Sequence, residues 1–94
     1  MSKIIDAAVT QLAAKVPSFD GIAKFVILDE GSIMIDADGV RAADEEAEVT
    51  MTATAEVFAA ILDGSMNPTM AFMTGKLSVD GSMGMAMKLG SVLG

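Results

Sequence analysis

The segment that follows Gly81 predicts a helix that is apolar on almost every side, and this feature limits how the chain can fold. Lys88 is its only charged residue, and methionine, alanine, leucine and valine fill most other positions. A helix without a polar face needs apolar surface on more than one side. In a chain of 94 residues a sheet can cover one side, so the other needs a second helix, a ligand or a partner protein.

Charge and residue usage argue against several functional classes. The net charge of −7 disfavours nucleic-acid binding and polybasic docking to anionic lipids. The chain has no cysteine and no histidine, which removes the common thiolate and imidazole bases, nucleophiles and metal ligands. We therefore expect no enzymatic activity, no cofactor and no metal. Because no apolar run is long enough for a membrane span and no secretory signal is visible, we expect a cytoplasmic protein without stable membrane insertion.

The nine methionines allow two interpretations. Methionine is unbranched and polarisable, so it fills irregular spaces and repacks easily. The residues are typical either of an adaptable core or of a cavity that accepts apolar guests of different shapes. Composition alone favours the core, because large internal cavities are rare.

The apolar periodicity predicts one α+β domain over residues 1–94. An amphipathic helix is expected over residues 2–16. Its apolar stripe consists of Ile5, Val9, Leu12 and Val16, and is flanked by Ile4 and Ala8. Alternating patterns predict strands over residues 23–28, 32–36, 40–42, 47–52 and 76–80. A second helix is expected between the N-cap Thr54 and Gly64, a helical turn at Pro68, and the final helix after Gly81.

Two acidic stretches are expected to be structural. Asp38-Gly39 predicts a hairpin turn rather than a calcium loop, because the third oxygen ligand and the bidentate glutamate are missing at the required offsets. Asp44, Glu45 and Glu46 form a run between strands, where no partner base or electrophile accompanies them. We expect this run to be a solvated loop.

The second half of the chain resembles the sterol carrier protein-2 (SCP2) lipid-binding domain family. The resemblance is ordered and gap-free from about Val49 to Leu89, whereas between Gly21 and Glu48 only the strand pattern agrees. The residues that carry it are Thr50-Met51-Thr52, Phe58, Gly64, Asn67-Pro68, Ala71-Phe72, Gly75-Lys76-Leu77, Gly81, Met83-Gly84 and Ala86-Met87-Lys88-Leu89. It implies a five-stranded mixed sheet covered by helices on one face, with an apolar tunnel between them that holds fatty acids, acyl-CoA, sterols or related lipids without catalysis.

A tunnel for alkyl chains needs apolar walls, since such ligands are held by buried area. Our wall candidates come from the sheet and from the helices, and for each one ordinary core packing is an alternative. They are Phe25, Ile27, Ile33, Ile35, Phe58, Ile61, Leu62, Met66, Met70, Phe72, Met73, Met83 and Met87. A charged headgroup would need a cation or a helix N-terminus, for which the candidates are Lys76, Lys88 and the N–H groups near Ser82.

The sequence therefore predicts a non-catalytic lipid carrier that binds a fatty acid, fatty acyl or sterol-like lipid. The alternative is a protein-interaction or dimerisation module that uses the apolar C-terminal helix and has no exchangeable ligand. In that alternative, a homodimer would form through the exposed apolar face of this helix.

Overall fold

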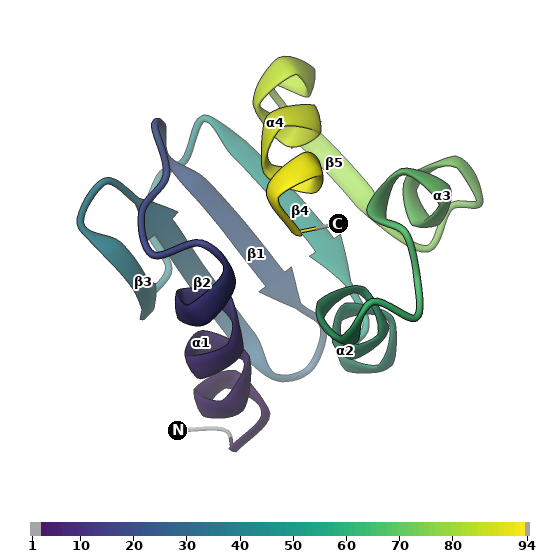
Figure 1. Ribbon diagram of the computed structural model, residues 1–94, viewed down its shortest axis with the longest axis horizontal. Coiled ribbons are helices and arrows are strands. Elements are labelled where there is room, and N and C mark those ends of the chain that lie inside the picture. The colour runs from purple at the N-terminus through teal and green to yellow at the C-terminus, as the bar shows by residue number, and fades with distance from the viewer. Residues whose placement is uncertain (1–2, 94) are drawn as a thin grey trace.

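The computed structural model describes residues 3–93. Its elements follow one another as shown in Figure 1. They are α1 (Lys3–Lys15), β1 (Ala23–Ile27), β2 (Gly31–Asp36), β3 (Gly39–Ala42), β4 (Val49–Ala53), α2 (Ala55–Asp63), α3 (Pro68–Met73), β5 (Ser78–Gly81) and α4 (Met83–Leu93). The predicted strand over residues 76–80 begins two residues later than expected, and Ser2 of the first predicted helix lies outside the described residues.

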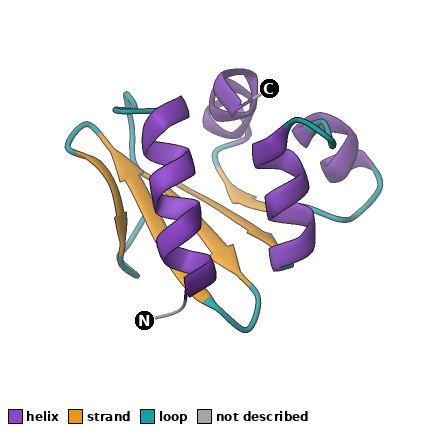
Figure 2. Ribbon diagram, turned by 60° about the horizontal axis from the view of Figure 1, so that its bottom comes forward, coloured by secondary structure: helices purple, strands orange, loops and turns teal. Residues whose placement is uncertain are grey.

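The five strands form one mixed sheet in the order β3-β2-β1-β4-β5. The β1–β4 pair is parallel, and the other neighbours are antiparallel. Figure 2 shows the helices on one side of this sheet. The predicted α+β fold, a five-stranded mixed sheet with helices on one face, is confirmed.

The core lies between the sheet and the helices. Strand alternation turns Phe25, Ile33 and Met51 to the same face, since Phe25 pairs with the other two in register. All three are buried, and the Phe25 ring packs against Phe58 of α2 with the centroids 5.0 Å apart. Side chains therefore fill the space between the sheet and the helices α1 and α2.

The stripe predicted for α1 is confirmed for most of its residues. Ile5, Leu12 and Val16 are buried, whereas Val9 is half-buried at the edge of the core. Of the two flanking residues, Ala8 is buried, whereas Ile4 is 43% exposed. The helix thus packs through a stripe rotated slightly from the expected one.

Side-chain and glycine caps set the limits of the middle helices. The Thr54 hydroxyl accepts a hydrogen bond from the Val57 N–H at 3.1 Å, and Gly64 ends α2 with φ of 87°. The Asn67 carboxamide oxygen accepts from the N–H groups of Thr69 at 2.8 Å and Met70 at 3.3 Å. These caps determine where α2 begins and ends and where α3 begins, as the sequence predicted for Thr54, Gly64 and Pro68.

Both acidic stretches make local hydrogen bonds and ion pairs. The Asp36 carboxylate accepts hydrogen bonds from the Asp38 N–H at 3.0 Å and from Arg41 Nη1, and so closes the β2–β3 hairpin. Asp44 pairs with Lys24 at 2.8 Å, and Glu45 pairs with Arg41 at 3.4 Å. The predicted hairpin is confirmed, and the acidic run lies in the connection between β3 and β4.

Candidate functional site

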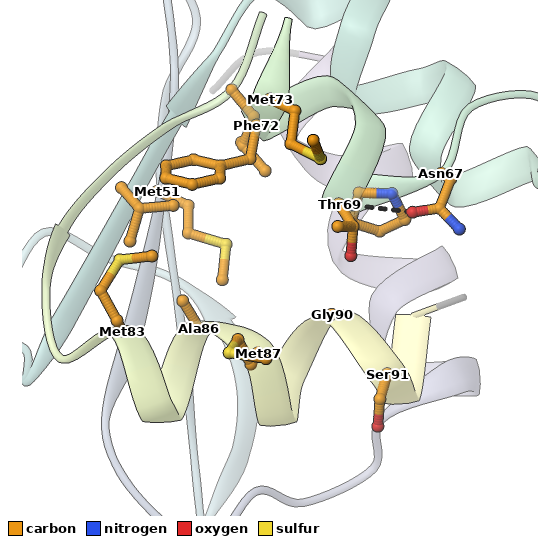
Figure 3. Close-up of a pocket in the computed structure, with 13 residues that line it drawn as sticks. Met51, Asn67, Thr69, Phe72, Met73, Met83, Ala86, Met87, Gly90 and Ser91 are labelled. Carbon is orange, nitrogen blue, oxygen red and sulfur yellow. Dashed lines mark hydrogen bonds between the residues drawn. The ribbon is translucent and has the colours of Figure 1, made fainter. Parts of the chain in front are cut away.

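A pocket of about 570 Å³ lies between α3, α4 and the edge of the sheet formed by β4 and β5 (Figure 3). Strands β4 and β5 provide Met51 and Val79, which face each other in register, and Leu77 precedes β5. The start of α3 provides Asn67, Pro68 and Thr69, and its last turn provides Phe72 and Met73. The residues of α4 that line the pocket are Met83, Ala86, Met87, Gly90 and Ser91.

Helix α4 reaches this position through contacts at both ends. The Ser82 N–H donates to the Glu48 carbonyl at 3.0 Å, which anchors the turn before the helix to the start of β4. The Ser82 hydroxyl then accepts from the Met85 N–H at 3.3 Å and caps the first turn. Further along, Leu89 and Leu93 are buried in the core. One face of α4 is therefore fixed to the core, and the neighbouring face borders the pocket.

Helix α3 forms the opposite wall. Pro68 and Ala71 are buried and hold the helix against the body of the protein. Where α3 approaches α4, residue 90 is a glycine, and a Cβ there would lie 3.7 Å from Pro68 Cβ. This is an ordinary contact distance, so Gly90 leaves the pocket open at a point that a larger side chain would fill.

The pocket wall is apolar, with an exposed rim. Met51 and Leu77 are buried at its base. Around the opening, the exposed fractions are 40% for Phe72, 73% for Met73, 44% for Met83 and 72% for Met87. We call these four the mouth residues. When an apolar ligand covers exposed apolar side chains of this kind, their removal from water lowers the free energy.

The polar atoms of the pocket lie at one end. Figure 3 shows Met51 and Met83 toward one end, and Asn67, Thr69 and Ser91 toward the other. Among the described residues that line the pocket, none carries a charged or titratable side chain. A lining of this kind is suited to holding an apolar molecule by contact area, since its side chains provide no acid or base for proton transfer.

The structure brings four predicted wall residues to this pocket, and they are the mouth residues Phe72, Met73, Met83 and Met87. Most of the other sheet and helix candidates lie in the hydrophobic core and do not line this pocket. Those in the core are Phe25, Ile27, Ile33, Ile35, Phe58, Ile61 and Leu62. Met66 is half-buried against the core, and Met70 is 56% exposed on α3 without lining the pocket.

The three headgroup candidates also lie away from the pocket lining. Lys88 Nζ is 3.3 Å from an Asp20 carboxylate oxygen and 5.7 Å from the centre of the Phe19 ring. The Ser82 hydroxyl caps α4, and Lys76 lies exposed between α3 and β5. None of the three is among the residues that line the pocket.

Sequence reasoning missed part of the lining. Met51 and Val79 belong to predicted strands, and their inward alternation could have identified them once the β4–β5 pairing was known. Thr69, Gly90 and Ser91 carry no apolar signal, and only the packing of α3 against α4 places them here. A smaller hollow of about 180 Å³ lies between α1 and α2, and Phe58 and Leu62 contribute to it.

Within residues 3–93, no helix has the length and hydropathy needed to cross a membrane.

The sequence model of the SCP-2 sterol transfer family matches residues 2–94. The chain belongs to this family. Hydroxysteroid dehydrogenase-like protein 2 of Xenopus laevis is 38% identical over 100 residues, which cover 98% of this chain and 24% of the relative. Human sterol carrier protein 2 is 48% identical over 46 residues, covering 49% of the chain and 8% of that protein. The chain thus spans about a quarter or less of these SCP-2 family relatives.

Solved structures confirm the SCP-2 fold. The solution structure of sterol carrier protein-2 from Aedes aegypti, in complex with the C16 fatty acid palmitate, matches with a TM-score of 0.79 at 21% identity. The match covers 99% of this chain and 96% of that one. The arrangement of one mixed sheet and its covering helices is therefore that of the SCP-2 family.

Proposed function

We propose that this chain is a non-catalytic carrier that holds a fatty acid, fatty acyl or sterol-like lipid in the pocket between β4, β5, α3 and α4. The observation that carries the proposal is an apolar pocket of about 570 Å³ without a charged lining side chain, in a chain of the SCP-2 family. The palmitate complex of the Aedes aegypti protein supports a lipid as the ligand class.

The size of the pocket agrees with a lipid ligand. Small-molecule sites occupy roughly 300–1,000 Å³, and each buried methylene contributes about 0.8 kcal/mol. Burial of about ten methylenes then supplies about 8 kcal/mol of transfer free energy, which offsets the entropy lost when the ligand is immobilised. The expected mechanism is partition of the alkyl chain from water into the pocket, with entry between α3 and α4.

The dehydrogenase part of the Xenopus relative's name lies outside this proposal, because the matched region is 24% of that protein. We propose that residues 1–94 act as one lipid-binding domain, and that the protein works in the cytoplasm. Fractionation of cells that produce the tagged full-length protein tests the compartment.

Titration with a fluorescent fatty acid tests the binding activity. We expect saturation at one ligand per chain and displacement by unlabelled long-chain lipids. A protein that is folded by circular dichroism and shows no saturable signal would overturn the proposal.

A further inference from the structure

The side chains that peroxides oxidise are of one kind in this chain. It contains nine methionines and no cysteine, histidine, tryptophan or tyrosine. In proteins with a reactive cysteine the thiolate competes for the oxidant, and here no thiolate is present. The thioether of methionine is therefore the first target of a two-electron oxidant in this sequence.

The fold divides the methionines between protected and accessible positions. Met34 and Met51 are buried, and Met66 and Met85 are half-buried. The methionines with the most exposed side chains lie on α3 and α4, and they are Met70, Met73, Met83 and Met87. Accessible thioether sulfur is thus concentrated on the two helices that border the pocket.

Three of the accessible thioethers surround the pocket opening. Met73 reaches it from α3, and Met83 and Met87 reach it from α4, as Figure 3 shows. Met70 is exposed on α3 but does not line the pocket. A change in the polarity of the three sulfurs at the opening therefore changes the surface that an alkyl chain contacts there.

Reaction with a hydroperoxide makes such a surface polar. The thioether sulfur attacks the terminal oxygen of ROOH, so that the O–O bond breaks and an S–O bond forms. The proton on the transferred oxygen passes to the leaving oxygen, which departs as ROH. Sulfur loses two electrons and the hydroperoxide gains them. The product, methionine sulfoxide, is polar. Its S=O group loses hydrogen bonds to water when an alkyl chain covers it, and this disfavours lipid binding.

We propose that Met73, Met83 and Met87 are oxidation sites at which hydroperoxides produce sulfoxides and so lower the affinity of the pocket for lipid. The inference rests on the proposed carrier function and adds its regulation. Methionine sulfoxide reductases reverse the change, because a dithiol supplies two electrons, becomes a disulfide and leaves the oxygen as water. The core is retained throughout, since Met34 and Met51 are protected by burial.

Graded treatment with hydrogen peroxide, followed by peptide mass spectrometry, measures which methionines react. We expect sulfoxide first at Met73 and Met87 and last at Met34 and Met51, in line with their exposure. Fluorescent fatty-acid titration of the oxidised protein should show an affinity at least about tenfold lower, with the folded circular dichroism spectrum retained. An unchanged affinity with sulfoxide at the opening, or a loss that occurs only on unfolding, overturns the proposal.

Leucine variants assign the effect to the opening, since leucine is apolar and resists peroxide. The quantity compared is the ratio of affinities before and after peroxide within each variant. In the triple variant Met73→Leu, Met83→Leu and Met87→Leu, peroxide should no longer lower the affinity, whatever its value before treatment. Met70→Leu is the matched control, because Met70 is exposed outside the pocket lining, and it should lose as much affinity as the unsubstituted protein. Equal losses in the triple variant and in this control would contradict the assignment.

Enzymatic repair gives a readout that does not depend on any substitution. Methionine sulfoxide reductases of both epimer specificities, with dithiothreitol as reductant, should restore the affinity of the oxidised protein. An affinity that stays low after the sulfoxides at the opening have been reduced overturns the proposal. A failure of the untreated protein to bind the fatty acid would instead overturn the carrier function, so the two failures are distinguishable.

Discussion

Met83 lies at the start of α4, where its side chain lines the pocket and remains 44% exposed. Met83→Gln keeps the length of the side chain and replaces the thioether with an amide that an alkyl ligand cannot hydrogen-bond. We expect lipid affinity to fall about tenfold, which corresponds to about 1.4 kcal/mol of lost apolar contact. Fluorescent fatty-acid titration measures the change.

Met70→Gln is the matched control for this prediction, since Met70 is exposed on α3 and does not line the pocket. The lipid affinity of the Met70→Gln variant should equal that of the unmodified protein. Equal losses in both variants would mean that Met83 does not contact the ligand.

Gly90 allows binding to be separated from folding. Leucine at this position should project into the pocket, and it also favours the helix by about 1 kcal/mol relative to glycine. We therefore expect Gly90→Leu to lose most lipid binding while its melting temperature stays the same or rises. Gly84→Leu is the control on the same helix, because only the Ser82 hydroxyl lies near the position of its Cβ, at 3.9 Å. Reduced binding in both variants would contradict the assignment of Gly90 to the pocket.

The sequence predicted which residues face the helices but not where the helix layer leaves a hollow. Phe25 and Met51 both alternate inward, and they are partners across β1 and β4. Yet Phe25 meets the Phe58 ring, while Met51 lines the pocket. This difference depends on how α2 and α3 pack over the sheet, which strand periodicity does not encode. In the same way, only the fold places Lys88 beside Asp20.

At the scale of elements, α3 is the wall with the weakest internal support. It has six residues, and its first turn depends on the Asn67 cap. Asn67→Ala should destabilise the protein by about 1 kcal/mol, whereas Asn67→Asp should restore the cap. Hydrogen exchange at the Thr69 and Met70 amides should accelerate in the alanine variant. Unchanged exchange there would show that packing of Pro68 and Ala71 alone holds α3.

The elements whose limits were well predicted are those with local signals. Thr54, Gly64 and the Asn67-Pro68 pair determine helix ends through hydrogen bonds to neighbouring residues. The parallel pairing of β1 with β4 has no such local signal, and the family resemblance implied only that the sheet would be mixed. Pairing between strands that are distant in the sequence depends on the whole sheet, so no local pattern predicts it.

At the scale of the molecule, the pocket lies beside the core rather than inside it. Buried side chains of α1, α2 and the central strands form a core cluster that includes Phe25, Ile33 and Leu12. We therefore expect the protein to fold without lipid and to gain stability when lipid binds. At a free ligand concentration one hundred times the dissociation constant, the gain should be about 2.7 kcal/mol. Chemical denaturation with and without palmitate measures it, and an unfolded lipid-free protein would contradict this expectation.

The central claim is that this pocket holds a lipid, and native mass spectrometry of the purified protein tests it most directly. Gentle ionisation followed by organic extraction should reveal one copurified lipid per chain, and Gly90→Leu should arrive without it. The extracted lipid would also identify the ligand class. A lipid-free protein that fails to bind a fluorescent fatty acid would contradict the claim, and a lipid-free dimer would favour the interaction-module alternative.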